Sequence, residues 1–198
     1  MSDALYAEAL ETFGRLLDEA RAAGDREPTA MTLATLDPDA RLSARIVLLK
    51  EFDARGFVFY TNTRSRKGRA LAVHPQAALL LHWKTLRDQV QVRIEGLVEP
   101  VAAVQADAYF ATRSRGSQLG AWASLQSEPL PDRVTFEDRY ARYEREYEDR
   151  PVPRPAHWSG YRLVPDAIEF WYGKAFRLHD RHAYRCSNGV WTRQSLYP

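Results

Sequence analysis

Cysteine is almost absent from this chain, which has only Cys186 among its 198 residues. A single cysteine excludes an intrachain disulfide and any metal site built from several cysteines, and it fits a reducing cytoplasm. We interpret Cys186 as a partly buried residue without a chemical role. The five histidines show no metal-ligand spacing, so we expect no metal centre.

Long hydrophobic runs and a strong net charge are also missing. The longest purely aliphatic run, residues 77–81, is far too short to span a bilayer. The N-terminus mixes acidic with apolar residues and lacks the basic start and apolar block of a secretory signal. The formal net charge of +2 is too small to attract nucleic acid or an anionic membrane along the whole chain. We therefore expect a soluble, cytoplasmic protein whose basic residues act in local clusters.

Glycine-rich phosphate loops and nucleophile motifs are missing as well. No Gly-rich run precedes a Lys-Ser/Thr pair or opens a βαβ unit, which excludes the usual nucleotide-hydrolase and dinucleotide loops. The chain has neither a G-x-S-x-G elbow nor a credible Cys-His pair. Nucleophilic hydrolysis therefore has no support in the sequence.

The chain does contain a helical start followed by many short β-rich segments. Apolar residues recur at helical spacing over 3–23, which predicts an amphipathic helix ending near Gly24. Turn signals divide the segments that follow, and Asn188-Gly189 is a strong hairpin signal between the last two. The predicted strands are residues 31–36, 43–52, 57–62, 77–83, 89–101, 160–164, 168–172, 183–186 and 190–196.

Further helices are predicted between these strands. Ser65 is placed to cap a helix over 65–73, and residues 102–112 and 134–147 also have helical patterns. The last of these is so heavily charged that we interpret it as solvated. The proline-rich stretch 151–155 predicts a stiff, extended connector.

These elements predict a mainly β fold with helices, of the α+β class. About nine mostly antiparallel strands favour a closed or nearly closed barrel, because closure removes exposed sheet edges. The length and the hydrophobic fraction of 45% suit one domain over residues 1–198. Within it we expect an N-terminal helix (1–25), barrel strands (28–101), a helical insertion (102–150) and C-terminal strands (156–198).

A first cluster of basic residues surrounds Ser65 at a predicted strand-to-helix junction. Free amides and the helix dipole make such a junction favourable for a phosphate. A solvated basic turn is the alternative interpretation. The basic residues of this cluster are Arg64, Arg66, Lys67 and Arg69.

A second cluster, residues 109–118, combines a phenol, guanidiniums and hydroxyls across a helix end. Tyr109 and Arg113 would share one helix face. Ser117 could begin the next short helix and offer its amide and hydroxyl to the same oxygens. Ordinary helix capping is the alternative interpretation.

A third cluster, Arg177 to Arg181, places two guanidiniums and an imidazole within five residues, shortly after the aromatic run Ile168 to Trp171. This combination suits a planar anionic ligand better than a protein core. We interpret Trp171 as a ligand contact and the other tryptophans as packing residues. Far upstream, Arg45 to Lys50 carries a cation at each end of an apolar strand.

These motifs resemble those of the pyridoxine (pyridoxamine) 5′-phosphate oxidase family of flavin enzymes. The resemblance runs from residue 28 to residue 198. It implies an antiparallel split β-barrel of Greek-key type with peripheral helices, in a homodimer that binds FMN non-covalently at each of two subunit interfaces. It further implies oxidation of pyridoxamine and pyridoxine 5′-phosphates by O2 to pyridoxal 5′-phosphate, with release of H2O2. The most specific motifs are residues 45–50, 59–62 with 65–67, 117–122 with 126–127, and 168–171 with 177–181.

The resemblance also assigns site residues, position by position. The expected flavin contacts are Arg45, Ile46, Val47, Leu48, Leu49, Lys50, Tyr60, Thr61, Ser65, Arg66, Lys67, Gln91, Gln126, Ser127, Trp171 and Arg181. The expected substrate contacts are Lys50, Tyr109, Arg113, Ser117, Arg177, Leu178 and His179, the first four on the substrate phosphate. Arg177 and His179 are the expected catalytic residues, acting mainly by orienting the substrate and stabilising charge.

The chain departs from the family pattern at three places. Gln89 and Gln91 are both candidates for one flavin contact, and the motif Arg93 to Gly96 favours Gln91, although both would share one strand face. Many relatives carry a longer N-terminal arm that covers the substrate, so we expect any lid to be reduced or to come from elsewhere. Ser195 stands where an arginine is common.

Two other functions remain open from the sequence. One is a related split-barrel flavin oxidase that acts on larger aromatic acids, as in the phenazine pathway. The other is a non-catalytic carrier of flavin or pyridoxal phosphate. The phosphate-type cluster at Tyr109, Arg113 and Ser117 disfavours the first, and the presence of Arg177 and His179 disfavours the second.

Overall fold

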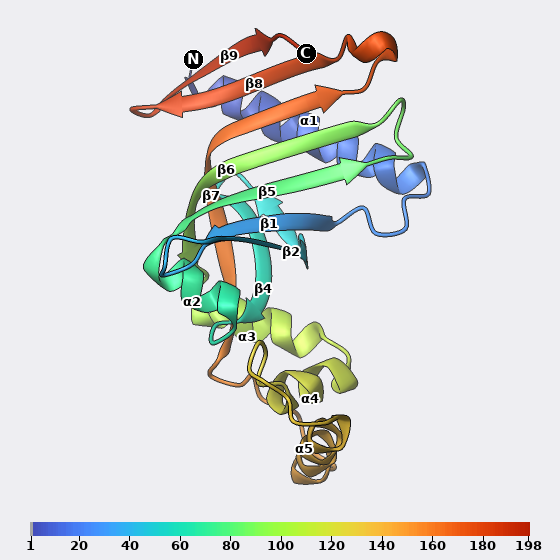
Figure 1. Ribbon diagram of the computed structural model, residues 1–198, viewed down its shortest axis with the longest axis vertical. Helices are drawn as coiled ribbons and strands as arrows, with labels where there is room; N and C mark the ends of the chain where they lie inside the picture. Colours follow the sequence, from blue (N-terminus) through green and yellow to red (C-terminus); the bar gives the residue numbers. More distant parts are fainter. Residues whose placement is uncertain (1) are drawn as a thin grey trace.

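The computed structural model describes residues 2–198, in which nine strands form one antiparallel sheet. The strands are β1 (Ala30–Leu36), β2 (Leu42–Leu48), β3 (Glu51–Asp53), β4 (Gly56–Asn62), β5 (Gln76–Trp83), β6 (Val90–Pro100), β7 (Trp158–Tyr172), β8 (Asp180–Ser187) and β9 (Val190–Leu196). Seven strands follow the order β2-β1-β5-β6-β7-β4-β3, while β8 pairs with β7 and β9 with β8. The sheet curls into the split half-barrel that the resemblance implied (Figure 1).

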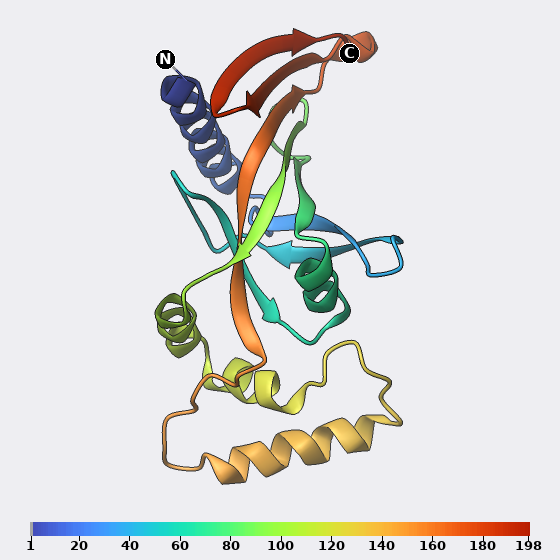
Figure 2. The ribbon, with the colours of Figure 1, turned by 90° about the vertical axis from the view of Figure 1, so that its left-hand side faces the viewer.

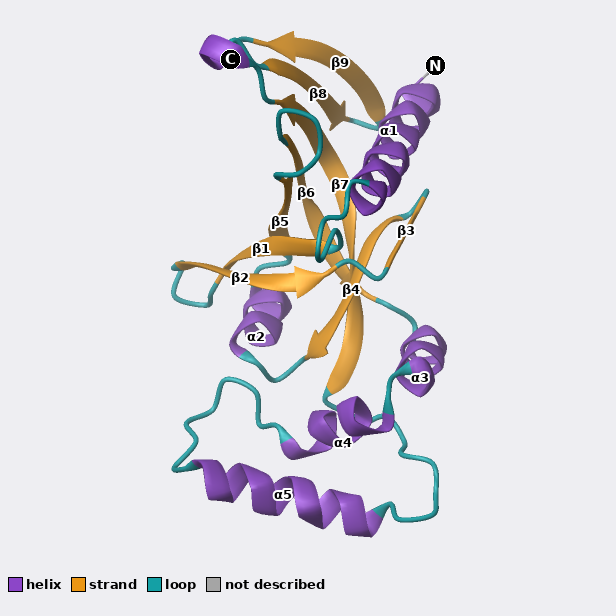
Figure 3. Cartoon of the chain, turned by 90° about the vertical axis from the view of Figure 1, so that its right-hand side faces the viewer, coloured by secondary structure: helices purple, strands orange, loops and turns teal. Residues whose placement is uncertain are grey.

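Helices lie against one face and at one end of this sheet (Figure 3). They are α1 (Ser2–Ala22), α2 (Arg66–Val73), α3 (Ala103–Thr112), α4 (Arg115–Ala123) and α5 (Arg133–Glu146), with a short 3-10 turn, η1 (Ala175–Arg177). The helices predicted over 3–23, 65–73, 102–112 and 134–147 are confirmed within one or two residues. No residue of α5 is buried, in agreement with its charged sequence.

The predicted strand over residues 43–52 is wrong, because the chain changes partner strands in the middle of it. The Leu49 amide donates to the Thr29 carbonyl, next to β1, at 2.8 Å. The Lys50 amide instead donates to the Val58 carbonyl of β4 at 2.9 Å. β2 and β3 therefore end the two halves of the sheet, and the barrel is split open at Lys50.

The strands predicted over 160–164 and 168–172 are a single long strand, β7. Pro165 lies opposite Gly96, where the pairing of β6 with β7 shifts register. A side chain at Gly96 would bring its Cβ to 2.1 Å from the Val164 carbonyl oxygen, so glycine allows the strands to pass the proline closely. β7 then runs from the helical end of the molecule to the β8–β9 hairpin (Figure 2).

The main core lies between α1 and the inner face of the sheet. The Phe13 ring is fully buried, with its centroid 4.9 Å from that of Phe52 and 5.0 Å from that of Phe57. A separate apolar cluster, which includes Phe110, Leu119 and Trp158, holds α3, α4 and the end of α5 against the start of β7. The two ends of the molecule thus have distinct packing.

Two further sequence predictions can be compared with the structure. Asn188 and Gly189 have φ values of 51° and 75°, the left-handed pair that a tight hairpin between β8 and β9 requires, so this turn is confirmed. Within residues 2–198, no helix has the length and apolar character needed to cross a membrane.

Replacing Phe13 with alanine should destabilise the protein by about 3–5 kcal/mol, because it removes a fully buried ring from a packed aromatic cluster. Denaturant unfolding of the flavin-free protein measures this change. Val134→Ala, at a position 61% exposed, is the control and should stay within about 0.5 kcal/mol of the parent. Equal effects of the two substitutions would contradict this account of the core.

Candidate active site

One cavity of about 450 Å³ collects residues from two of the three predicted clusters. Its walls come from β2, β4, α2, the loop after α4 and the junction between α3 and α4. Segments far apart in the sequence therefore meet here. The lining residues are Ile46, Val47, Leu48, Lys50, Tyr60, Thr61, Lys67, Tyr109, Arg113, Ser114, Ser117, Gln126 and Trp158.

Lys67 supplies a buried positive charge at one end of this cavity. Its Nζ donates to Thr61 Oγ1 at 3.0 Å and to Gln126 Oε1 at 3.1 Å, and both partners are uncharged. Burial, helped by the nearby charge of Arg45, lowers the pKa of Lys67 to about 8. A buried ammonium with only neutral partners is unfavourable unless an anion accompanies it, so this end fits a phosphate.

Arg45 and Arg66 strengthen the positive potential behind Lys67. The Arg45 guanidinium donates to the Leu33 carbonyl at 2.9 Å and to neighbouring hydroxyls, and burial followed by the charge of Arg66 lowers its pKa. Arg66 pairs with Asp37 at 3.1 Å. Both arginines lie outside the cavity lining, and Arg66 is held by a carboxylate.

Ser65 is confirmed as the residue that caps α2. Its Oγ accepts from the Gly68 amide at 3.3 Å and donates to the Asn62 carbonyl at 2.7 Å. The side chain is fully buried, and its Oγ also accepts from Lys67 Nζ at 3.4 Å, so the hydroxyl serves both the start of the helix and the buried lysine. A Cβ on Gly68 would lie 2.2 Å from the Thr63 carbonyl oxygen, which shows how closely α2 packs on the end of β4.

Arg113 supplies a second positive charge, at the other end of the cavity. It follows α3 with an extended backbone (ψ 148°), so the expectation that it shares a helix face with Tyr109 is wrong. Its guanidinium carbon lies 4.8 Å from the Trp158 ring centroid, and burial lowers its pKa. Its Nη1 is buried without a hydrogen-bond partner among the described residues. An incoming anion would satisfy this donor.

A stack of aromatic rings lines the same cavity. The Tyr60 and Tyr109 ring centroids are 4.0 Å apart, and those of Tyr60 and Trp158 are 5.3 Å apart. The Tyr60 hydroxyl donates to Glu51 Oε1 at 3.1 Å. Trp158 and Ser114 both line the cavity, and Glu51 supports it, although the sequence assigned a site role to none of them. No spacing pattern distinguishes Trp158 from a packing residue, so only tertiary structure shows its position.

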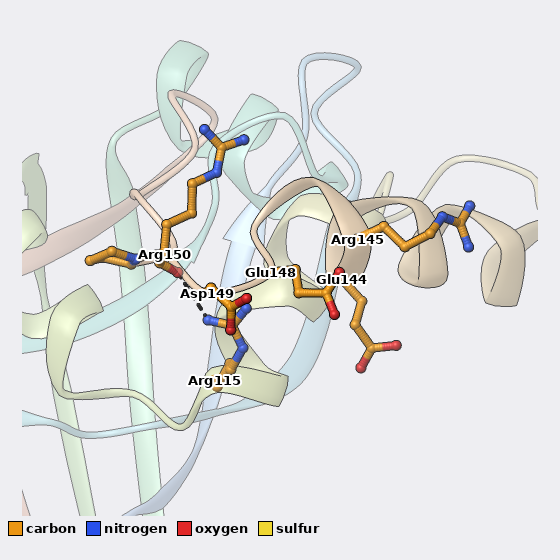
Figure 4. Close-up of a pocket in the computed structure, with 7 residues that line it drawn as sticks. Arg115, Glu144, Arg145, Glu148, Asp149 and Arg150 are labelled. Carbon is orange, nitrogen blue, oxygen red and sulfur yellow. Dashed lines mark hydrogen bonds between the residues drawn. The ribbon is translucent and has the colours of Figure 1, made fainter.

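The start of α4 lies two residues before the predicted one. Ser114 occupies the N-cap position, α4 begins at Arg115, and Ser117 falls in the first turn. Arg115 anchors this turn by donating to the carbonyls of Tyr147 and Arg150, at 2.7 and 3.1 Å, at the end of α5 (Figure 4). The open hollow of about 760 Å³ beside Arg115 is lined by side chains of both charge signs. We interpret this hollow as a gap in the packing interface between α4 and α5.

The third predicted cluster lies at the opposite end of the molecule, beside the β8–β9 hairpin (Figure 1). The His179 ring lies against Trp171, with the centroids 4.4 Å apart and the ring planes inclined at 42°. Arg181 pairs with the buried carboxylate of Glu169 through Nε and Nη2, at 2.9 and 2.8 Å. Arg177 lies in an exposed turn with a left-handed backbone (φ 63°).

The length of β7 explains why the clusters do not meet within one chain. Trp158 in the cavity and Trp171 beside His179 are the two ends of the same strand, separated by 13 residue steps. At about 3.3 Å per residue they are up to ~40 Å apart. The expected site residues outside the cavity lining are Arg45, Leu49, Ser65, Arg66, Gln91, Ser127, Trp171, Arg177, Leu178, His179 and Arg181.

The two candidate glutamines differ in position. Gln91 lies in β6, opposite His82 on one side and Trp171 on the other. Gln89 precedes the strand with φ 92°, and its Oε1 is 3.1 Å from His82 Nε2. The expectation that both side chains share one face of a strand is therefore wrong, because β6 begins at Val90. Its position beside Trp171 keeps Gln91 as our predicted flavin contact.

Comparison with known proteins agrees with the fold and the cavity. Residues 17–146 match the family model described as pyridoxamine 5′-phosphate oxidase, and residues 158–198 match the pyridoxine 5′-phosphate oxidase C-terminal dimerisation region. Pyridoxine/pyridoxamine 5′-phosphate oxidases of Myxococcus xanthus and Xanthomonas oryzae are 55% and 56% identical to this chain. The alignments cover 96% of this chain and 92% of the Myxococcus protein, and 98% of both chains for Xanthomonas.

Solved structures show the same architecture. PhzG from Burkholderia lata, in complex with tetrahydrophenazine-1-carboxylic acid, superposes with a TM-score of 0.89 at 34% identity, covering 96% of this chain and 92% of PhzG. An FMN-binding protein from Nostoc punctiforme superposes with a TM-score of 0.75 at 17% identity, over 95% of this chain and 96% of that one, and shows the fold alone. Fold and cavity thus define the class of split-barrel flavoproteins. Within this class, the chain belongs to the pyridoxamine 5′-phosphate oxidase family.

Lys67 predicts a pH dependence of flavin binding. Its pKa of about 8 means that the flavin-free protein loses this charge above pH 8, whereas a bound phosphate favours the protonated amine. FMN affinity should therefore be highest near pH 7, where the FMN phosphate is a dianion, and fall by up to about tenfold per pH unit above pH 8. Quenching of flavin fluorescence on binding measures this affinity at each pH. Riboflavin, which lacks the phosphate, and the Lys67→Met variant with FMN should show no such fall; equal slopes for FMN and riboflavin would contradict the assignment.

Proposed function

We propose that this protein oxidises pyridoxamine 5′-phosphate and pyridoxine 5′-phosphate with O2 to pyridoxal 5′-phosphate, using FMN. The observation that carries this proposal is a cavity whose two least exposed cations, Lys67 and Arg113, have no carboxylate partner among the described residues. Two phosphates, one on the flavin and one on the substrate, would account for both. The single cysteine supports a cytoplasmic location.

The residues at the Lys67 end fit the flavin phosphate. Lys67, with the α2 amides and the charges of Arg45 and Arg66 behind it, would hold the phosphate, and Thr61 and Gln126 keep the lysine in place. The apolar side of β2, at Val47 and neighbouring residues, offers a flat wall for the flavin ring. The donor set of this cavity therefore suits the group that the family binds.

The residues at the Arg113 end fit the substrate phosphate. Lys50, Tyr109, Arg113 and Ser117 all line this region and can all donate hydrogen bonds. Each hydrogen bond to a charged phosphate oxygen contributes about 1.5–3 kcal/mol. Stacking on Tyr60 fixes the ring of Tyr109, and the face of Trp158 fixes the guanidinium of Arg113. The substrate is thus held by its phosphate on preformed groups.

Arg177 and His179 would orient the reacting end of the substrate. The Lys174 amide donates to His179 Nδ1 at 3.1 Å, so the neutral ring carries its proton on Nε2 and can donate from that atom. A ring in this form acts as a hydrogen-bond donor, which supports positioning and charge stabilisation over strong-base catalysis. A flavin held by Lys67 and β2 would supply the redox chemistry, with a hydride from the substrate C4′ reducing it, O2 reoxidising it to give H2O2, and water releasing ammonia in the amine case.

Because β7 separates His179 from the cavity, we propose that each site joins the cavity of one subunit to the His179 loop of the other. The match of residues 158–198 to a dimerisation region supports this arrangement. The exposed apolar side chains on the same turn, Phe176 at 92% and Leu178 at 67%, also suit burial against a second chain.

Mixing two inactive variants tests the shared site. Arg113→Ala disables the part of the site that the cavity provides, and His179→Ala disables the part that the His179 loop provides. Each variant homodimer should therefore have little activity. Random reassociation after mild unfolding should restore about a quarter of parental activity, because half of the dimers are mixed and each has one intact site. Vitamer oxidation before and after mixing measures it, and sedimentation confirms that dimers re-form. If mixing restores nothing although dimers exchange, the shared site is excluded.

A substrate comparison tests the reaction itself. The flavin-loaded protein should release H2O2 with pyridoxamine and pyridoxine 5′-phosphates but not with the unphosphorylated vitamers, since only phosphates satisfy Arg113. The similarity to PhzG makes a bulky aromatic acid the second candidate substrate, yet the identity of 34% is well below the 55–56% of the vitamer oxidases. Oxidation of aromatic acids alone would favour that candidate, and flavin binding without any turnover would favour a carrier.

A further inference from the structure

Ser114 lies at the substrate-phosphate end of the cavity, and nothing in the sequence assigned it a role. It stands at the N-cap position of α4, where a serine usually accepts a hydrogen bond from a helix amide. Its side chain makes no capping bond here. Instead, its hydroxyl is hydrogen-bonded to that of Ser117, with the two oxygens 2.9 Å apart.

This bond limits what Ser117 can do toward a ligand. Ser114 donates to Ser117 Oγ, which uses acceptor capacity of Ser117 and leaves its proton free to point into the cavity. Arg113 and Lys50 beside it are donors with no acceptor atom. Side-chain donors therefore dominate at this end of the described cavity, and the hydroxyl oxygens of Tyr109, Ser114 and Ser117 are its remaining side-chain acceptors.

Charge at this end of the cavity is of one sign. The described lining contains no carboxylate, and Glu51, the nearest one in the network, accepts from Tyr60 and from Gln105 Nε2 at 2.8 Å. The titratable or charged groups of the lining are Lys50 after β2, Tyr60 on β4, Lys67 on α2, Tyr109 on α3 and Arg113 after α3. A ligand that brings two negative charges and no proton suits these groups best.

We propose that Ser114 is a positioning residue that holds Ser117 as a donor, so that the cavity prefers the substrate phosphate as its dianion over the monoanion. A monoanion carries a P–OH group that needs an acceptor and offers one charge fewer to Lys50 and Arg113. The inference rests on the proposed function, because it takes the ligand here to be a phosphate ester. It adds to that function a preference of the cavity for the dianionic form of the substrate phosphate, and it names Ser114 as the residue that maintains this preference.

The experiment compares inorganic phosphate with sulfate as competitive inhibitors of pyridoxamine 5′-phosphate oxidation by the flavin-loaded protein. Sulfate stays a dianion across the pH range in which phosphate changes from monoanion to dianion. Protein groups whose charge changes in this range affect both ions alike, so the ratio of the two inhibition constants reports the charge state of the bound phosphate. Below the second pKa of phosphate, phosphate should weaken relative to sulfate by close to tenfold per pH unit.

Ser114→Ala tests the positioning role. It should weaken both ions by about two- to tenfold, as expected for one hydrogen bond, and should flatten the pH dependence of their ratio, because Ser117 can then turn to accept. FMN affinity should not change, because the flavin phosphate is expected at Lys67. Thr112→Ala is the matched control, since the Thr112 hydroxyl donates to the Tyr109 carbonyl at 2.8 Å and does not line the cavity, and it should behave as the parent.

A ratio that does not change with pH, or a Ser114→Ala profile identical to the parental one, would overturn the inference. Failure of the proposed function has a different signature, namely no oxidation of either vitamer. The rise in melting temperature of the flavin-loaded protein with each anion then gives the same ratio without turnover. A pH-dependent ratio that flattens in Ser114→Ala supports the inference by either readout.

Discussion

Two buried cations without carboxylate partners, Lys67 and Arg113, are the constraint on which the site depends. Placing a positive charge in a partly dry cavity with only hydroxyls, an amide and a ring face around it is unfavourable in the free protein. The lowered pKa values of both groups express this cost. Anionic ligands would remove this cost, which is why we propose that the cavity binds two phosphates.

The sheet explains how these cations are kept apart and in place. The change of strand partner at Leu49 and Lys50 opens the barrel, and α2 and the α3–α4 junction approach the opening from two sides. β7 then runs to the other end of the molecule, where the rings of His179 and Trp171 are in tilted contact. One strand thus carries residues of both parts of the site, which we propose a second chain brings together.

Much of the fold was predictable because local patterns specify it. The helical period of α1, the Ser65 cap and the Asn188-Gly189 turn each depend on a few neighbouring residues. Other features depend on contacts distant in sequence. Pro165 stays within β7 only because Gly96 faces it, and the switch at Lys50 depends on which strands flank the chain.

The site residues also divide into those that the sequence indicated and those that only the tertiary structure shows. The basic and hydroxyl clusters were visible in the sequence, and the resemblance assigned most of the residues that line the cavity. Trp158 and Ser114 were missed because an aromatic residue after a connector and a serine before a helix have ordinary structural explanations. The helical placement of Arg113 was wrong because α3 ends one residue earlier, yet the ring of Trp158 still holds its guanidinium in the cavity.

The most direct measurement is a crystal structure of the flavin-loaded protein. The account predicts the FMN phosphate at Lys67 of one chain, with Trp171 and His179 of a second chain against the same flavin. A flavin bound by Lys67 and Trp171 of one chain, or bound away from Lys67, would contradict it.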